Sequence, residues 1–329
     1  MAGGRWPVAG SREAGRLVTG YSPLATATMT SPSIEDVIAA IPEWRGRAVE
    51  AEVVHGGLTN RAYCVRVDGT PHFVSIPGAR SELLAIGRDE EIYNTSAAAE
   101  TGIAPRVLHR LPESGVLVTE FLQGRTLSKT DMHVADMPIR LAAAVRRLHS
   151  ARPFANAFDL FRLTHDYAAV VASDRLPYPP AYGAMLPRLT EMERAAGAHR
   201  LPPCPCSNDL VPENLIDDDG RLWIVDYGYS GNNDPCSELG NACCEADYGQ
   251  GEMEALCAAY FGSADDRLLA RMHLYAIMSD VAWSLWSVIQ ESVSDLSFDF
   301  GAYGRQRWER ARALLESEEL RIWIAAADR

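Results

Sequence analysis

Three polar side chains in the second half of the chain have the types and spacing that phosphoryl transfer requires. Asp209 and Asn214 lie five positions apart in CPCSNDLVPENLI, and Asp226 follows in IVDYG after two short apolar runs joined by DDDG. In kinases one carboxylate accepts the proton of the attacking hydroxyl, while an amide oxygen and a second carboxylate hold Mg²⁺ against the phosphates. A hairpin at DDDG would fix the distance between such a base and its metal ligands.

Each of these residues also has an ordinary structural explanation. Asn and Asp tolerate turn geometry and bond their own backbone, so Asp209 and Asn214 suit a surface turn, and Asp226 suits the end of a strand. The three residues in this order, around a predicted hairpin, favour the catalytic interpretation. Their hard oxygen atoms are the ligands that Mg²⁺ prefers.

Length and charge limit the classes of protein that fit. The chain has 329 residues, which allows two domains, and carries 44 acidic against 31 basic residues for a net charge of −13. Because no stretch is dense in Lys and Arg, a nucleic-acid partner is not expected. No apolar run is long enough to cross a bilayer, so membrane insertion is not expected either.

The seven cysteines and the first residues indicate a cytoplasmic protein. An odd number of cysteines without a C-x-x-C pair is typical of reduced thiols. A metal set of Cys204, Cys206, Cys243 and Cys244 is disfavoured, because these spacings match the usual zinc pattern poorly. Residues 1–32 lack the continuous apolar segment of a signal peptide, and we expect a disordered leader there.

The remaining patterns predict an α+β fold with two lobes. Ser33 and Asp36 form a capping box at the start of a short helix. Three β-rich runs between residues 50 and 76 predict an antiparallel meander, followed by a helix from about 82 to 100 that ends at Gly102 and a strand over 115–124. Residues 137–150 and most of the chain after Pro235 have helical spacing. We therefore expect a small β-rich N-terminal lobe (33–124), a linker near 122–130 and a larger, mainly helical C-terminal lobe (125–329).

From about residue 50 to 315 the sequence resembles the choline/ethanolamine kinase branch of the aminoglycoside phosphotransferase superfamily. This resemblance implies a protein-kinase-like fold and the cofactors ATP and Mg²⁺. The ordered motifs that carry it are GGLTN (56–60), IPG (76–78), ELLAIGRDEEIYNT (82–95), GIAP (102–105), VLVTEFLQGRTLS (116–128), LHS (148–150), NDLVPENLI (208–216), IVDYGYSGNNDP (224–235), ELGN (238–241), SDVAWSLW and SFDFGAYG.

The resemblance also implies roles for individual residues. Asp209 becomes the catalytic base, and Asn214 and Asp226 become magnesium ligands. Glu91 matches the glutamate of the helix that follows the meander, and the hinge from Glu120 to Leu122 would meet the adenine ring. The loop over the nucleotide phosphates would contain Gly56, Gly57, Thr59 and Asn60.

An acceptor pocket is predicted from aromatic residues near the C-terminus. Trp283 and Trp286 are three positions apart in a helical segment, so they share one face, and Tyr303 follows. Several aromatic faces bind a quaternary ammonium well, at about 0.5–2 kcal/mol for each contact. Two such tryptophans are commonly a plain core stripe, but here they match the family's choline cage. Glu245 matches an acidic pocket residue of that family, and its alternative is an exposed charge beside Asp247.

Three positions differ from the family pattern. Ser75 stands where a Lys or Arg usually contacts the phosphates and pairs with the equivalent of Glu91; one lost charge-assisted contact removes roughly 1.5–3 kcal/mol. Ser207 replaces a His that orients the catalytic loop, and Gly228 replaces an acidic residue. The candidates to supply the charge missing at Ser75 are Arg61, Arg80 and Arg88.

The leading hypothesis is therefore an ATP- and Mg²⁺-dependent kinase of choline, ethanolamine or a related amino alcohol. A second hypothesis is a kinase of another hydroxylated cation, such as an aminoglycoside, thiamine or a natural-product intermediate. A third is a catalytically silent binding protein, which the serine at position 75 would favour. The sequence predicts neither the oligomeric state nor a choice between ATP and GTP.

Overall fold

The computed structural model describes residues 31–54, 60–78, 87–294 and 296–329. The predictions for Gly56, Gly57, Thr59 and Arg80 lie outside these residues. So do nearly all of the expected leader and the start of the helix predicted from residue 82.

The N-terminal part of the described chain is an antiparallel sheet of five strands in the order β1-β2-β3-β5-β4. The predicted meander is confirmed as its first three strands, and the predicted strand after Gly115 as β5. Strand β4 was not predicted, because its short sequence VLHRL gives little periodicity and its pairing with β5 is irregular. The bounds are β1 Val49–Val54, β2 Asn60–Val67, β3 Thr70–Pro77, β4 Val107–Leu111 and β5 Val116–Glu120.

Local sequence explains how this sheet forms. Asp68 and Gly69 join β2 to β3 and both have positive φ values of 48° and 81°, as a two-residue Asp-Gly hairpin turn requires. Helix α1 (Ile34–Ala40) starts at the predicted capping box, where the Asp36 N–H donates to Ser33 Oγ at 3.1 Å. The apolar side of α1 and the 3₁₀ turn η1 (Pro42–Trp44) are buried together with valine and isoleucine side chains of the sheet.

Helix α2 (Arg88–Glu100) lies between β3 and β4 in the chain. Its side chains also contact the helical part of the protein. It begins with Gly87 as N-cap, and the chain turns after it at Gly102, whose φ of 74° is the left-handed conformation expected there. The amide of Asn94, which is fully buried, donates to Asn156 Oδ1 and Ser230 Oγ, both at 2.9 Å. These bonds fix α2 against the segment that follows Asp226.

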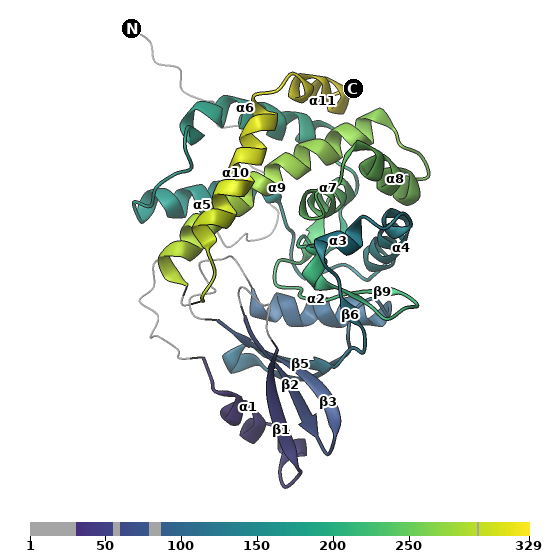
Figure 1. The fold of residues 1–329 in the computed structure, drawn as a ribbon, viewed down its shortest axis with the longest axis vertical. Coiled ribbons are helices and arrows are strands. Elements are labelled where there is room, and N and C mark those ends of the chain that lie inside the picture. The colour runs from purple at the N-terminus through teal and green to yellow at the C-terminus, as the bar shows by residue number, and fades with distance from the viewer. Residues whose placement is uncertain (1–30, 55–59, 79–86, 295) are drawn as a thin grey trace, which may run out of the picture. The chain divides into compact units, whose positions relative to one another are not determined.

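The C-terminal part is mainly helical, as predicted (Figure 1). Two small sheets interrupt it, β6-β8-β9 and β7-β10. The first contains the predicted hairpin, and the expected linker is partly ordered by it, since β6 pairs with β8. The elements of the C-terminal part are β6 Arg125–Thr126, α3 Lys129–Met132, α4 Met137–His149, α5 Leu160–Ser173, α6 Tyr182–Ala198, β7 Cys204–Cys206, η4 Pro212–Asn214, β8 Leu215–Asp217, β9 Leu222–Ile224, β10 Gly231–Asn233, α7 Pro235–Glu245, α8 Gln250–Phe261, α9 Asp266–Val293, α10 Phe300–Leu315 and α11 Glu319–Ala327. In the N-terminal part, the turn η3 (Pro112–Ser114) precedes β5.

The long helix α9 passes through the core of this part, with α7 and α10 packed against it (Figure 1). The contact with α10 depends on Gly304, because a Cβ atom there would lie only 1.7 Å from Ser287 Oγ. This close approach brings Tyr303 of α10 beside Trp286 of α9, whose ring centroids are 6.0 Å apart. The crossing of the two helices thus assembles residues that are far apart in the sequence.

Candidate active site

The segment before Asp209 is held in place by a buried glutamate. Glu238 of α7 is fully buried and accepts the backbone N–H groups of Ser207 at 2.8 Å and Asn208 at 2.7 Å. Asn208 has a φ of 60°, and its amide donates to the carbonyl of Tyr229 at 3.0 Å. Because the backbone on both sides of the turn is bonded, the direction in which Asp209 leaves the loop is fixed.

The hairpin brings the three predicted polar residues together. The Asn214 amide donates to Asp209 Oδ2 at 3.1 Å and to the Asp209 carbonyl at 3.0 Å. The Val225 N–H donates to the Asn214 carbonyl at 2.9 Å, which places Asp226 next to this pair. Asp226 has a φ of 61° and accepts the Gly228 N–H at 3.2 Å, so its backbone turns out of the strand at this point.

These carboxylates affect one another electrostatically. Asp209 is half-buried, whereas Asp226 is exposed to solvent. Burial therefore raises the pKa of the Asp209 carboxyl well above its ordinary value, and the negative charges of Asp226 and Glu245 raise it further. Arg307 and the bond from Asn214 oppose this effect. A bound cation would relieve the repulsion between the carboxylates.

The donor set fits Mg²⁺ chemically. The Asn214 amide nitrogen is used for Asp209, which leaves its oxygen facing away from those bonds and available as a ligand. Asp226 Oδ1 accepts the Gly228 N–H, and this bond leaves Oδ2 available as a ligand. An amide oxygen and a carboxylate oxygen are hard ligands of the kind Mg²⁺ takes while it keeps several waters.

Helix α2 contributes an ion pair on the other side of Asp226. Arg88 Nη1 donates to Glu91 Oε2 at 2.7 Å, and Arg88 Nη2 donates to Asn60 Oδ1 at 3.2 Å. Burial raises the pKa of the Glu91 carboxyl, Arg88 lowers it and Asp226 raises it. Arg88 also opposes the rise in the pKa of Asp226. Its guanidinium is therefore close to both acids and pairs with Glu91.

The predicted aromatic residues form one continuous group. The ring centroids of Trp283 and Trp286 are 6.2 Å apart and nearly perpendicular, and Trp286 is 6.0 Å from Tyr303. Tyr229, three residues after Asp226, extends the group with its ring 5.0 Å from Trp283. Both tryptophans are buried, so they also serve the core. Burial raises the pKa values of the Tyr229 and Tyr303 hydroxyls, and the charge of Asp209 raises them further.

Glu245 is buried, so the alternative of an exposed helix charge is wrong. Its carboxylate forms a bidentate ion pair with Arg307, with Nη1 and Oε1 2.7 Å apart. The Arg307 guanidinium also lies over the Tyr303 ring, 4.7 Å from its centroid. Glu245 is thus beside the aromatic group as predicted, but a cation of the protein already balances its charge.

The other predicted nucleotide contacts lie at the end of β5. Arg106 Nε donates to Glu120 Oε2 at 2.8 Å, so this side chain is engaged at the surface and its backbone is what remains for a ligand. The chain then passes Leu122 and enters β6, where Arg125 lies opposite Asp217 of the hairpin in the antiparallel pairing of β6 with β8. The hinge segment is thereby tied to the hairpin that carries Asn214.

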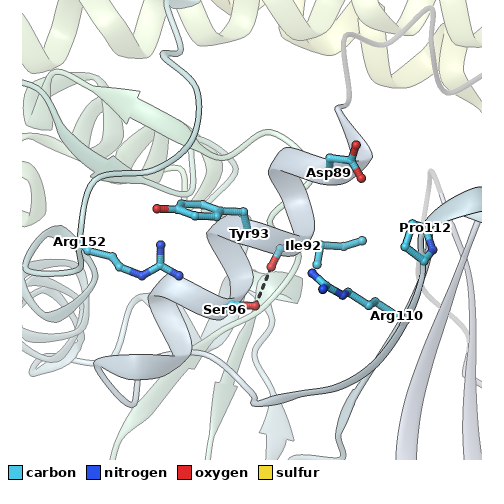
Figure 2. Close-up of a pocket in the computed structure, with 7 residues that line it drawn as sticks. All are labelled: Asp89, Ile92, Tyr93, Ser96, Arg110, Pro112 and Arg152. Carbon is cyan, nitrogen blue, oxygen red and sulfur yellow. Dashed lines mark hydrogen bonds between the residues drawn. The ribbon is translucent and has the colours of Figure 1, made fainter.

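Two pockets flank α2. One of 160 Å³ lies between its start and the segment after Asp226, and its lining includes Glu91, Gly228 and Tyr229. The other, of 410 Å³, contains no predicted site residue. Figure 2 shows side chains of α2 along it, with Arg110 on the strand side and Arg152 opposite, stacked on Tyr93 at 4.1 Å. The larger pocket is therefore separate from the candidate active site.

Sequence reasoning missed the residues that support the site. Glu238 and Asn241 accept backbone N–H groups on either side of Asp209, that of Leu210 at 2.8 Å for Asn241, and Arg307 pairs with Glu245. Glu238 and Asn241 belong to the motif ELGN, so their place in that motif was a signal. Ser207 does not replace an orienting His by hydrogen bonding, because its buried hydroxyl has no partner among the described residues.

An antiparallel sheet, a mainly helical second part and paired acids at a hairpin define a phosphotransferase of the kinase-like type with an alcohol group as acceptor. The family model for choline/ethanolamine kinase matches residues 51–258. The chain belongs to the choline/ethanolamine kinase family.

Known proteins similar to the chain agree with this assignment. A choline/ethanolamine kinase family protein from Mesorhizobium loti has a solved structure with a TM-score of 0.78 and 34% identity, covering 89% of this chain and 98% of that one. The structure of choline kinase LicA from Streptococcus pneumoniae has a TM-score of 0.73 and 27% identity, covering 85% of this chain and 98% of that one. A structure of LicA in complex with AMP is also similar. Ethanolamine kinase 2 from Mus musculus is 26% identical over 82% of this chain and 77% of its own.

The fold extends to more distant structures. A complex of an aminoglycoside phosphotransferase with GDP and kanamycin has a TM-score of 0.59 at 17% identity, a likeness of fold alone. Among the described helices, none is both long and apolar enough to span a membrane.

Proposed function

We propose that this protein transfers the γ-phosphoryl group of ATP to the hydroxyl of choline or a related amino alcohol. The observation that carries the proposal is the contact of Asp209 with Asn214, with Asp226 beside them and an aromatic group that includes Tyr229, three residues after Asp226. Family membership supports the reaction type, and the site residues support the class of acceptor.

Asp209 is the proposed base. Its carboxylate would accept the hydroxyl proton of the acceptor as the phosphoryl group is transferred. Asn214 and Asp226 would hold Mg²⁺, which neutralises charge on the phosphates when it is bound. The bond from Asn214 to Asp209 keeps the base and the ligands in one unit, and Glu238 fixes that unit from behind.

Arg88 is the proposed replacement for the strand cation. It pairs with Glu91 at 2.7 Å, and both side chains are largely buried, at 17% and 7% exposed. A guanidinium in this place, near Asp226, is suited to the nucleotide phosphates. Arg61 is less suited, because it donates to the Pro32 carbonyl at the surface.

The ammonium group of the acceptor would contact the aromatic rings. Because Arg307 already neutralises Glu245, the attraction of a cation rests mainly on Trp283, Trp286 and Tyr303 together with the charge of Asp209. Such a pocket discriminates weakly between different degrees of methylation. Choline and its less methylated relatives are therefore the first substrates to test.

An assay of ADP formation over a panel of amino alcohols tests the proposal. We expect turnover with choline, ethanolamine or a methylated intermediate, and none when Mg²⁺ is removed. Trp286→Leu should raise KM for a quaternary alcohol more than for ethanolamine, whereas Trp223→Leu, on the hairpin surface, serves as control. The absence of turnover with every cationic alcohol would overturn the proposal.

The same preparation of the protein also tests the two alternative functions. If an aminoglycoside or thiamine is phosphorylated and the tryptophan variants do not matter, the acceptor is another hydroxylated cation. If Mg·ATP gives no thermal stabilisation, the chain is a binding protein without catalytic activity, since a tight ligand of the native state raises its stability. We also propose that the boundary between the N-terminal, nucleotide-binding lobe and the C-terminal, catalytic lobe lies between residues 124 and 125.

A further inference from the structure

A cluster of thiol and imidazole groups lies behind the catalytic loop and has no role in phosphoryl transfer. His149, Cys204 and Cys206 each offer one ligand atom, and these three atoms all lie within 4.8 Å of one another. The cysteines are the first and last residues of β7, and His149 is the last residue of α4. Cys243 and Cys244 are not part of this cluster, so the disfavoured set of four cysteines does not form.

The distances within the cluster suit a tetrahedral ion. Cys204 Sγ and Cys206 Sγ are 3.9 Å apart, and Cys206 Sγ is 3.5 Å from His149 Nε2. With zinc–sulfur bonds of about 2.3 Å and zinc–nitrogen bonds of about 2.0 Å, tetrahedral angles separate two sulfurs by about 3.8 Å and sulfur from nitrogen by about 3.5 Å. Both separations are present without movement of the backbone.

The surroundings of His149 favour a ligand at Nε2. Its Nδ1 lies 2.6 Å from the hydroxyl of Tyr260 on α8. A metal-bound imidazole usually donates its other N–H to such a partner, which fixes the orientation of the ring. The Nε2 atom lies 3.5 Å from Cys206 Sγ and 4.0 Å from Glu238 Oε1.

Charge and access also fit a divalent ion. Binding of Zn²⁺ would release the thiol protons of both cysteines to solvent, and two thiolates with a neutral imidazole balance the ion's two charges. Cys204 is only half-buried, which leaves a route for the ion and for a water as fourth ligand.

A disulfide suits these cysteines less well. The sulfurs would have to approach from 3.9 Å to about 2.0 Å. Residues two apart in a strand have Cα atoms separated by about 6.6 Å, near the upper limit for a disulfide. Closing the bond would distort β7, whereas a metal ion accepts the strand as it is.

We infer that His149, Cys204 and Cys206 form a binding site for one thiophilic divalent ion, Zn²⁺, that fastens the start of the catalytic loop. Cys206 is followed directly by Ser207 and Asn208, whose N–H groups Glu238 holds from the other side. The ion would thus anchor the strand from which Asp209 emerges. This inference does not depend on the proposed substrate.

The test is a Co²⁺ and Zn²⁺ titration of the full chain, stripped of metal and kept reduced. We expect one equivalent of Co²⁺ to give a sulfur-to-cobalt charge-transfer band, which Zn²⁺ then removes. Cys204→Ser and His149→Gln should each weaken binding by at least about 100-fold, and Tyr260→Phe by about 10- to 100-fold. Cys64→Ser, a buried cysteine of β2, is the control and should bind as the unsubstituted chain does.

Zn²⁺ should also raise the melting temperature of the unsubstituted chain and of Cys64→Ser but not that of Cys204→Ser, a half-exposed position where serine is tolerated. No charge-transfer band, or equal loss in the Cys64 variant, would overturn the inference. So would formation of a Cys204–Cys206 disulfide in air by a chain that takes up no metal. None of these measurements depends on kinase activity, so they separate this site from the proposed function.

Discussion

Arg307 of α10 pairs with both carboxylate oxygens of Glu245 at the end of α7, and the two side chains are only 7% and 3% exposed. Burial alone would lower the pKa of the guanidinium, but Glu245 raises it above its ordinary value. The guanidinium is therefore charged inside the protein, directly beside Tyr303. It joins two helices at the predicted acceptor pocket.

We expect Arg307→Met to lower the free energy of unfolding by about 3–5 kcal/mol, because it leaves a buried carboxylate without its partner. Adding Glu245→Gln should recover most of that loss. Urea denaturation of the two variants measures both effects. The exposed pair Arg312–Glu316 is the matched control, and its removal should cost about 1 kcal/mol or less. Equal losses at the two pairs would contradict the expectation.

Asp209→Asn tests the proposed base. The amide cannot accept the hydroxyl proton, so we expect kcat to fall by about 10²- to 10⁴-fold. Nucleotide affinity should change little, because Asp209 is not a proposed ligand of the phosphates. Steady-state turnover and calorimetric titration of Mg·ATP separate the two quantities. Asp219→Asn in the exposed hairpin turn, where φ is 63° and asparagine is tolerated, should behave as the unsubstituted chain does.

Much of this site follows from local sequence. The capping box at Ser33 and the DDDG hairpin are local patterns, and both form where they were predicted. Motif order was sufficient to place Asp209, Asn214 and Asp226, because a hairpin of fixed length brings its two ends together. The i, i+3 spacing of the tryptophans likewise gave a shared face.

Local sequence patterns could not predict the partners of these residues. Arg307 meets Glu245 across 62 positions in the chain, and only the packing of α7 and α10 against α9 brings them together. Cys206 meets His149 across 57 positions. For such pairs the sequence supplies the residue types but not the distances, which depend on how helices pack. The choice of Arg88 among three candidate arginines is of the same kind.

A histidine far from the site should make stability depend on pH. Burial lowers the pKa of His273 to about 4, where its ring stacks on Trp323 with centroids 4.1 Å apart. Between pH 6.5 and about 4 the unfolded chain binds a proton that the folded chain does not, so stability falls as the pH falls. From pH 7.5 to 5 this group should cost roughly 1–2 kcal/mol.

Urea denaturation of His273→Gln at the two pH values checks this expectation. The difference between pH 7.5 and pH 5 should shrink by that amount relative to the unsubstituted chain. A His273 variant with the full pH dependence would show that other groups cause it.

The ion pair of Arg88 with Glu91 gives the sharpest test of the nucleotide site. Arg88→Leu removes a charge-assisted contact of roughly 1.5–3 kcal/mol, so we expect Mg·ATP affinity to fall by about ten- to over a hundredfold. Because β3 carries Ser75 where the family usually places a cation, the double variant Arg88→Leu with Ser75→Lys should recover part of the affinity. Arg61→Leu, whose contact is with the Pro32 carbonyl, should bind normally. If the Arg88 variant binds Mg·ATP as well as the Arg61 variant does, the guanidinium pairs with Glu91 for structural reasons alone.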